Sequence, residues 1–181
     1  MNWANLVTYL RILLIPAVIA CFHSTIPSAN LWATVLFSIA SLSDWLDGYL
    51  ARKLNQSSEF GAFLDPVADK LLVAVVLIML VASYPVLWFA AAVIITRELL
   101  ISALREWMAG KGKRDTVAVA FSGKLKTTIQ MFAIIGLLLA NDEYPHWIWQ
   151  IGFYGIHFAA LISVYSMLQY FKNAWSTLQE D

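Results

Sequence analysis

The sequence predicts an all-α membrane protein, with six transmembrane helices packed into one bundle. Apolar residues make up 60% of the 181 positions and charged residues only 13%, a balance too apolar for an ordinary soluble domain. The apolar residues gather into six runs, each close to the roughly 20 residues that a helix needs to cross a bilayer. Polar or turn-forming residues separate these runs.

The six predicted spans cover residues 5–23, 31–51, 61–82, 86–105, 122–140 and 147–170. We expect the first span to be retained, because it has no small-residue cleavage site and Arg11 lies inside it, whereas a signal peptide carries its positive charge ahead of the apolar region. The links are short, the longest running from Glu106 to Phe121, and no repeat or low-complexity stretch interrupts them. We therefore expect a single domain over residues 1–181.

Charged residues cluster at one end of the third, fourth and fifth spans. The third span is continuously apolar only from Leu71 onward, so its first two turns are expected to line a wet surface. The charged residues of this group are Asp65, Asp69 and Lys70 in the third span, Arg97, Glu98 and Arg105 in the fourth, and Lys124 and Lys126 in the fifth. Charges inside a membrane helix are costly unless they face a cavity or one another, so they are functional candidates. For Arg97, pairing with a buried carboxylate is the alternative reading.

The basic residues predict the orientation of the bundle. With both termini in the cytoplasm, all twelve Lys and Arg residues fall in cytoplasmic links or in the adjoining helix ends. The three outer links contain none of them and carry Asp142 and Glu143 instead, as the positive-inside rule requires. This topology also brings the carboxylates of the second and third spans to the cytoplasmic side, where nucleotides and metal ions are available.

Four aspartates at that side are the candidate metal ligands: Asp44, Asp47, Asp65 and Asp69. Three positions separate the first two and four separate the last two, so on helices each pair would share one face. Hard cations such as Mg²⁺ and Mn²⁺ take oxygen ligands, and Mg²⁺ sites commonly combine carboxylates with substrate phosphates. The aspartates therefore point to metal-dependent phosphate chemistry.

The aspartates belong to a longer pattern, Asp44-x-x-Asp47-Gly48-x-x-Ala51-Arg52, then eight residues, then Gly61-x-x-x-Asp65-x-x-x-Asp69. This stretch resembles the signature of the CDP-alcohol phosphotransferase family at every defined position. The resemblance implies a six-span enzyme that holds two divalent cations, Mg²⁺ or Mn²⁺, through the four aspartates, with Asp69 also the general base. It further implies that Gly48, Ala51, Arg52 and Gly61 surround the cytidine nucleotide together with Asp44 and Asp47, and that Asn5 and Thr8 of the first span contribute to the same site.

Within this family, the segments DWLDGYLAR, FGAFLDPVADK, TRELLISALREW and GKLKTTIQM are most similar to bacterial phosphatidylglycerophosphate synthases. That subfamily joins CDP-diacylglycerol to sn-glycerol 3-phosphate and releases CMP. Because this acceptor carries a phosphate, we expect cationic side chains around it, and Arg97, Arg105 and Lys124 would supply them. Lys126 could share this task, although two residues beyond Lys124 it would point to a different helix face. Inositol phosphate, phosphatidylglycerol and serine remain alternative acceptors.

Other protein classes agree less well with the sequence. A cation transporter would place its site near the midplane and show paired broken helices in two repeated halves, and no such halves occur here. An intramembrane prenyltransferase has no role for the Gly48 and Ala51-Arg52 positions, and an EF-hand needs a different ligand spacing.

The expected partners of the protein are membrane lipids, and no nucleic acid is expected to bind. A homodimer is compatible with the sequence. The expected location is the bacterial cytoplasmic membrane.

Overall fold

The computed structural model describes residues 3–54, 59–113, 116 and 121–179, without the side chains of residues 3–6, 44–54, 59, 60, 62, 63, 65, 121, 122 and 124. The described residues contain no strand. They form α1 (Trp3–Phe22), α2 (Ala29–Leu54), α3 (Glu59–Ser83), the short 3₁₀ helix η1 (Pro85–Leu87), α4 (Trp88–Gly110), α5 (Phe121–Leu139) and α6 (His146–Leu178). The prediction of an all-α protein with six long helices is confirmed.

Several helices extend beyond the apolar runs that predicted them. The sixth predicted span ends at residue 170, whereas α6 continues to Leu178. Pro66–Ser83, Pro85–Gly110 and His146–Leu178 are long and apolar enough to cross a membrane, and shorter apolar stretches lie in α1, α2 and α5. Large apolar side chains such as Leu13, Phe132 and Leu161 are about two-thirds exposed, with 68%, 69% and 68% of their surface free. Such a surface suits a bilayer, where lipid tails replace water around the helices.

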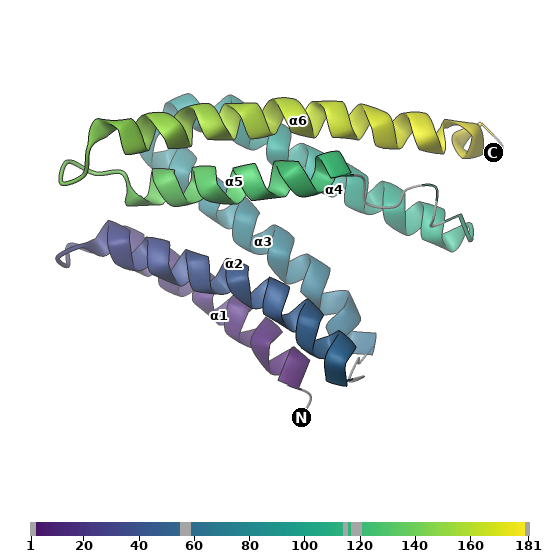
Figure 1. Cartoon of the computed structure of the whole chain (residues 1–181), viewed down its shortest axis with the longest axis horizontal. Coiled ribbons are helices and arrows are strands. Elements are labelled where there is room, and N and C mark those ends of the chain that lie inside the picture. Colours follow the sequence, from purple (N-terminus) through teal and green to yellow (C-terminus); the bar gives the residue numbers. More distant parts are fainter. Residues whose placement is uncertain (1–2, 55–58, 114–115, 117–120, 180–181) are drawn as a thin grey trace.

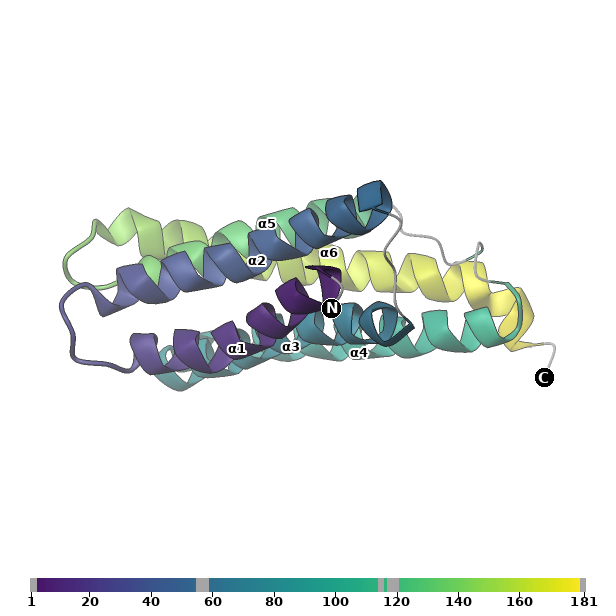
Figure 2. The ribbon, with the colours of Figure 1, turned by 90° about the horizontal axis from the view of Figure 1, so that it is seen from below.

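The helices form two neighbouring groups that separate towards one end of the molecule. Helix α1 packs against α2 and α3, while α6 packs against α4 and α5; α2 with α5 and α3 with α4 join the groups. Links 23–28 and 140–145 lie at the end that we call the outer end, and the C-terminus lies at the opposite, inner end (Figure 2). Towards the inner end α1, α2 and α3 diverge from α4, α5 and α6 (Figure 1).

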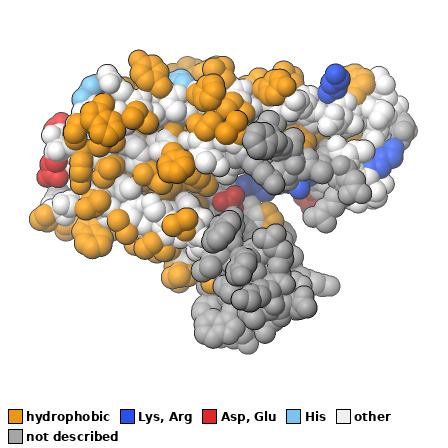
Figure 3. All heavy atoms as spheres, in the orientation of Figure 1, with side chains coloured by type: hydrophobic (Ala, Val, Ile, Leu, Met, Phe, Trp, Pro, Cys, Tyr) orange, Lys and Arg blue, Asp and Glu red, His pale blue; other side chains and the backbone are white. Residues whose placement is uncertain are grey.

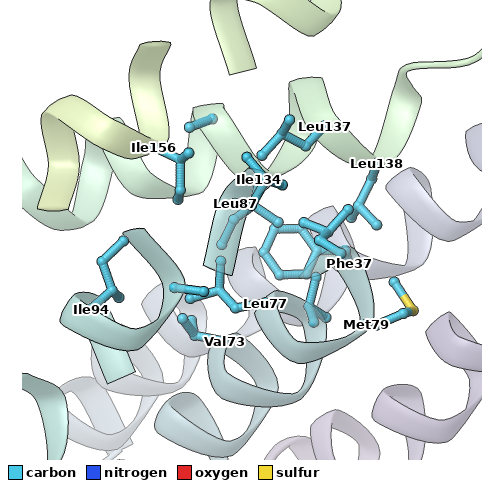
Figure 4. Packing of buried hydrophobic residues seen from close by; sticks show 14 of the residues in the cluster. Phe37, Val73, Leu77, Met79, Leu87, Ile94, Ile134, Leu137, Leu138 and Ile156 are labelled. Atoms are coloured by element: carbon cyan, nitrogen blue, oxygen red, sulfur yellow. The ribbon is translucent and has the colours of Figure 1, made fainter. Parts of the chain in front are cut away.

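The main apolar core fills the space between the helices where the two groups meet. Phe37 of α2, Leu77 of α3 and Ile134 of α5 point into it and are at most 1% exposed (Figure 4). A second, smaller cluster joins α4 to α6 nearer the inner end, with Met108 and Ala174 both fully buried. In a membrane such packing stabilises the bundle mainly through close contact between side chains, because lipid is as apolar as the core.

Hydrogen bonds close the outer end of the bundle. The Asn30 side chain of α2 donates from Nδ2 to the carbonyl oxygens of Leu138, at 2.9 Å, and Ala140, at 3.2 Å. The hydroxyl of Tyr84, between α3 and η1, donates to the same Ala140 oxygen at 3.0 Å. These side chains satisfy carbonyls that the end of α5 leaves without helical partners. Burial, and then the negative charge of Asp142, raise the pKa of Tyr84.

Glycines bring α5 and α6 into close contact at the same end. A Cβ atom on Gly152 of α6 would lie 2.9 Å from the backbone nitrogen of Leu137 and 3.1 Å from the carbonyl oxygen of Ala133. On Gly136 of α5 it would lie 3.3 Å from the Ile148 oxygen. Small residues of this kind let membrane helices approach until their backbones touch. The outer halves of α5 and α6 therefore form one tightly packed pair.

Candidate active site

The two aspartate pairs lie on the helices that the spacing predicts. Asp44 and Asp47 belong to the second half of α2, and Asp65 and Asp69 belong to the first half of α3. Both helices run without interruption through their pair, and they pack against each other. Of the four side chains, only that of Asp69 is among the described ones, where it is half-buried. The ligand geometry of the predicted metal site thus lies outside the described residues.

Asp69 borders a small cavity between α3, α4 and α5. The cavity has a volume of about 40 Å³, and Lys70, Glu98, Lys126 and Gln130 are among the other residues that line it. The side-chain oxygen of Gln130 is buried here, and no hydrogen-bond partner for it is present among the described residues. The predicted general base is therefore next to a group of charged and polar side chains from two other helices.

Glu98 is the centre of this group. Its Oε1 atom accepts a short hydrogen bond from Nζ of Lys126, and it also lies 3.4 Å from Nη1 of Arg97. The Lys126 side chain is 1% exposed and that of Arg97 is 8% exposed, whereas Glu98 keeps 24% of its side-chain surface free. One carboxylate of α4 thus compensates two buried cations, one on its own helix and one on α5.

Arg97 is fixed from its other side by α6. Its Nη2 atom donates to Oγ of Ser166 at 2.9 Å, and Ser166 in turn donates to the carbonyl oxygen of Ser163 at 3.0 Å. The guanidinium also lies over the ring of Tyr170, with its carbon 5.7 Å from the ring centroid, a cation–π contact. The sequence allowed either a functional Arg97 or one paired with a buried carboxylate, and the structure contains that pairing.

A larger cleft opens beside these residues towards the inner end. Its volume is about 480 Å³, and charged residues of α3 and α4 line it, namely Lys70, Arg97, Glu98, Arg105 and Glu106. Red and blue side chains lie close together near the middle of the face that Figure 3 shows. Among the described residues no carboxylate lies within 4 Å of Arg105, which is half-exposed. Arg105 therefore offers its positive charge to the cleft.

The first helix contributes buried polar residues near the aspartates. Thr8 and Arg11 are both 0% exposed, and Nε of Arg11 lies 3.4 Å from Oγ of Ser43, the residue before Asp44. Gly61 of α3 is likewise buried. The side chains of Asn5, Ala51, Arg52 and Lys124 lie outside the described residues, and so does any contact they make. The structure thus brings Thr8, Asp69, Arg97 and Arg105 to the inner half of the bundle and leaves the other predicted contacts untested.

The sequence named Glu98 only as one of several charged functional candidates, and it favoured Lys124 over Lys126 for the acceptor phosphate because of the helix face. Both are central to the charged group that the structure describes. For Glu98 the signal was present, because a carboxylate inside an apolar span is costly and usually pairs with a cation. Which cation it takes depends on the packing of α4 against α5 and α6, which no spacing within one helix reveals.

Comparisons with known proteins agree with this architecture. The model of the family described as CDP-alcohol phosphatidyltransferase matches residues 1–169. A protein of Yersinia enterocolitica named CDP-diacylglycerol–glycerol-3-phosphate 3-phosphatidyltransferase is 43% identical over 182 residues, which cover 99% of this chain and 98% of that protein. Proteins of the same name are 44% identical in Shigella flexneri serotype 5b, covering 98% and 97%, and 45% identical in Salmonella choleraesuis, covering 96% and 94%.

A solved structure shares the fold. The crystal structure of Mycobacterium tuberculosis phosphatidylinositol phosphate synthase in its apo form superposes with a TM-score of 0.66, covering 93% of this chain and 88% of that one, at 20% identity. At this identity the likeness concerns the arrangement of the helices alone. The family assignment rests instead on the family model, which matches nearly the whole chain, and on relatives that align over almost their full length. The chain belongs to the CDP-alcohol phosphatidyltransferase family.

Proposed function

We propose that this enzyme transfers the phosphatidyl group of CDP-diacylglycerol to sn-glycerol 3-phosphate, giving phosphatidylglycerophosphate and CMP in the synthesis of anionic phospholipids. The observation that carries the proposal is the 43–45% identity, over almost the whole chain, to relatives named for this reaction. The charged cleft beside Asp69 supports it, because it offers cationic side chains to a phosphorylated acceptor next to a carboxylate able to take a proton.

Two divalent cations, Mg²⁺ or Mn²⁺, fit the donor set at this end of the bundle. Two contacting helices carry two carboxylates each, and carboxylate oxygens are the ligands that such cations prefer. Asp44, Asp47, Asp65 and Asp69 would hold them. When bound, the cations would neutralise the charge that builds up on the diphosphate as CMP leaves.

The chain's own residues carry the remaining steps. Asp69 accepts the proton of the acceptor hydroxyl, whose oxygen then attacks the phosphorus of the lipid directly. The sequence offers no activated Ser, Cys or His at this end of the bundle, so direct transfer is preferred over a covalent intermediate. Around the nucleotide we place Asn5, Thr8, Gly48, Ala51, Arg52 and Gly61, where small residues let the ligand approach the backbone.

The acceptor phosphate is bound by positive charge on α4 and α5. Arg105 and Lys124 act directly, and Arg97 adds charge from the wall of the cleft. We further propose that the protein resides in the bacterial cytoplasmic membrane with this cleft on the cytoplasmic side, as the distribution of Lys and Arg predicts. A homodimer is compatible with this arrangement.

The test is to supply the purified protein with CDP-diacylglycerol, Mg²⁺ and one of three acceptors: glycerol 3-phosphate, inositol phosphate or serine. We expect CMP release to be fastest with glycerol 3-phosphate. Faster release with another acceptor would show that this alcohol, and not glycerol 3-phosphate, is the substrate, and the family assignment would stand. Metal-dependent ion flux without CMP release would favour a transporter.

One variant tests the acceptor site itself. Arg105→Ala should raise the KM for glycerol 3-phosphate at least about tenfold while the KM for CDP-diacylglycerol changes little, because a charge-assisted contact to phosphate is lost. Lys172→Ala is the matched control, since Lys172 is an exposed cation of α6 that does not line the cleft. If the two substitutions changed the KM for glycerol 3-phosphate equally, Arg105 would not be a binding residue for the acceptor phosphate.

A further inference from the structure

The acceptor of the proposed reaction presents more than a phosphate to the cleft. Glycerol 3-phosphate carries two hydroxyl groups, of which one reacts and one does not. A cationic pocket binds the phosphate, but it does not distinguish an alcohol with a second hydroxyl from one without it. Such discrimination needs a polar protein group whose hydrogen bond would otherwise be left unmade.

Glu98 offers an oxygen suited to this task. Within the part of the chain that the structure describes, its side chain makes two polar contacts, with Nζ of Lys126 and with Nη1 of Arg97, and both end on Oε1. Its side chain is 24% exposed and lines the 480 Å³ cleft, so Oε2 is the atom that remains available there. An ionised carboxylate accepts hydrogen bonds and donates none. A neutral hydroxyl is therefore a suitable partner, whereas a phosphate is repelled.

The surroundings hold this carboxylate in place. Lys126 is buried on α5, and Arg97 is fixed to α6 through Ser166 and Tyr170. Three helices thus converge on one side chain. A group held in this way is preorganised, so little freedom is lost when a ligand binds to it.

Glu98 also lies at a useful spacing from the proposed phosphate-binding residue. Arg105 follows it by seven residues on α4, almost two helical turns, so both side chains project from the same face about 10 Å apart along the axis. Both line the same cleft. The cleft, at about 480 Å³, has room for a small phosphorylated polyol.

We propose that Glu98 is a specificity-determining residue, whose Oε2 atom accepts a hydrogen bond from the non-reacting hydroxyl of the acceptor. The proposal rests on the proposed function and refines it. In this arrangement Lys126 serves to hold Glu98 in position, and Arg105 binds the phosphate.

The experiment compares two acceptors, glycerol 3-phosphate and 3-hydroxypropyl phosphate, which keeps the phosphate and the primary hydroxyl but lacks the secondary one. With CDP-diacylglycerol and Mg²⁺ we expect the wild-type kcat/KM to be at least about tenfold higher for glycerol 3-phosphate, as expected for a hydrogen bond to a charged group. In Glu98→Ala this ratio should fall towards one. In Glu106→Gln it should be unchanged, since Glu106 is an exposed carboxylate on the same cleft with no proposed contact.

Each outcome bears on the proposal. Equal use of both acceptors by the wild-type enzyme would overturn it without any variant, and so would a Glu98→Ala enzyme that keeps the wild-type ratio. If Glu98→Ala is too unstable to purify, the double variant Glu98→Met/Lys126→Met removes the accepting oxygen without leaving Lys126 as a charge that has lost its partner, and it should show the same reduced ratio. Absence of CMP release by the wild-type enzyme with glycerol 3-phosphate would instead refute the proposed function.

Discussion

The buried pair of Glu98 and Lys126 makes an asymmetric prediction about stability. We consider two single substitutions that each remove one charge and keep similar volume, Glu98→Gln and Lys126→Met. Glu98 provides a carboxylate in direct contact with Lys126, whose side chain is 1% exposed, and Asp69 lines the same small cavity. Glu98, in contrast, has a second cation 3.4 Å away in Arg97 and faces the cleft with 24% of its side-chain surface.

The expected magnitudes follow from what each substitution leaves behind. Glu98→Gln leaves the buried ammonium group of Lys126 and the guanidinium of Arg97 without the carboxylate that contacts both, which costs about 3–5 kcal/mol in the free energy of unfolding. Lys126→Met leaves a carboxylate that still contacts Arg97 and reaches water, so we expect a loss of about 1 kcal/mol. The double variant removes both charges, and it should be more stable than Glu98→Gln alone, because the two effects are coupled.

The assay is reversible unfolding of the four proteins in detergent, followed by the helical circular dichroism signal. A difference of about 3 kcal/mol corresponds to a factor of about 150 in the unfolding equilibrium, which such titrations resolve. The reasoning is refuted if Lys126→Met is as destabilising as Glu98→Gln, or if the double variant is no more stable than Glu98→Gln.

Four other predictions follow from the structure and the proposed mechanism. Asn substitutions of the four proposed metal ligands, Asp44, Asp47, Asp65 and Asp69, should each abolish CMP release. At the first three positions they should also lower metal affinity, whereas Asp69→Asn should keep partial metal binding in an equilibrium titration. Gly152→Ala should destabilise the protein by about 1–3 kcal/mol in thermal unfolding, because its Cβ would lie 2.9 Å from backbone, while Gly110→Ala, with nothing within 4 Å, should not. A cysteine at Ser57 should react with an impermeant probe only from the cytoplasmic side, and labelling from the outer side alone would contradict the topology. The pKa of the Tyr84 hydroxyl is raised above 10.0 in the folded protein, so the unfolded chain loses this proton at a lower pH than the folded one. The free energy of unfolding should therefore fall as the pH rises past 10, and Tyr84→Phe should weaken that dependence.

The sequence predicts the helices well because the bilayer imposes a simple rule on length and polarity. All six predicted spans correspond to helices, and the errors lie at the ends, as where α6 continues to Leu178. Hydropathy detects the part of a helix inside lipid and misses the polar turns that follow it. The single domain over residues 1–181 stays a prediction.

The candidate site is predicted only in part, for a different reason. The aspartate spacing is a property of single helices, and α2 and α3 carry those residues as expected. The link between Glu98 and Lys126 depends on how α4 and α5 rotate against each other, information that one sequence does not display. The roles of the aspartates, the nucleotide contacts and the acceptor residues remain predictions for the experiments above.

The close contact of α5 and α6 near Gly152 lies far from the inner end where the charged cleft opens. The glycine-mediated contact that packs these two helices most closely is thus separate from the cleft proposed to select the alcohol. Substitutions can accumulate around the cleft without disturbing the packing at the opposite end, which makes acceptor choice open to evolutionary change. The mycobacterial protein, with the same arrangement of helices at 20% identity, is named for a different alcohol.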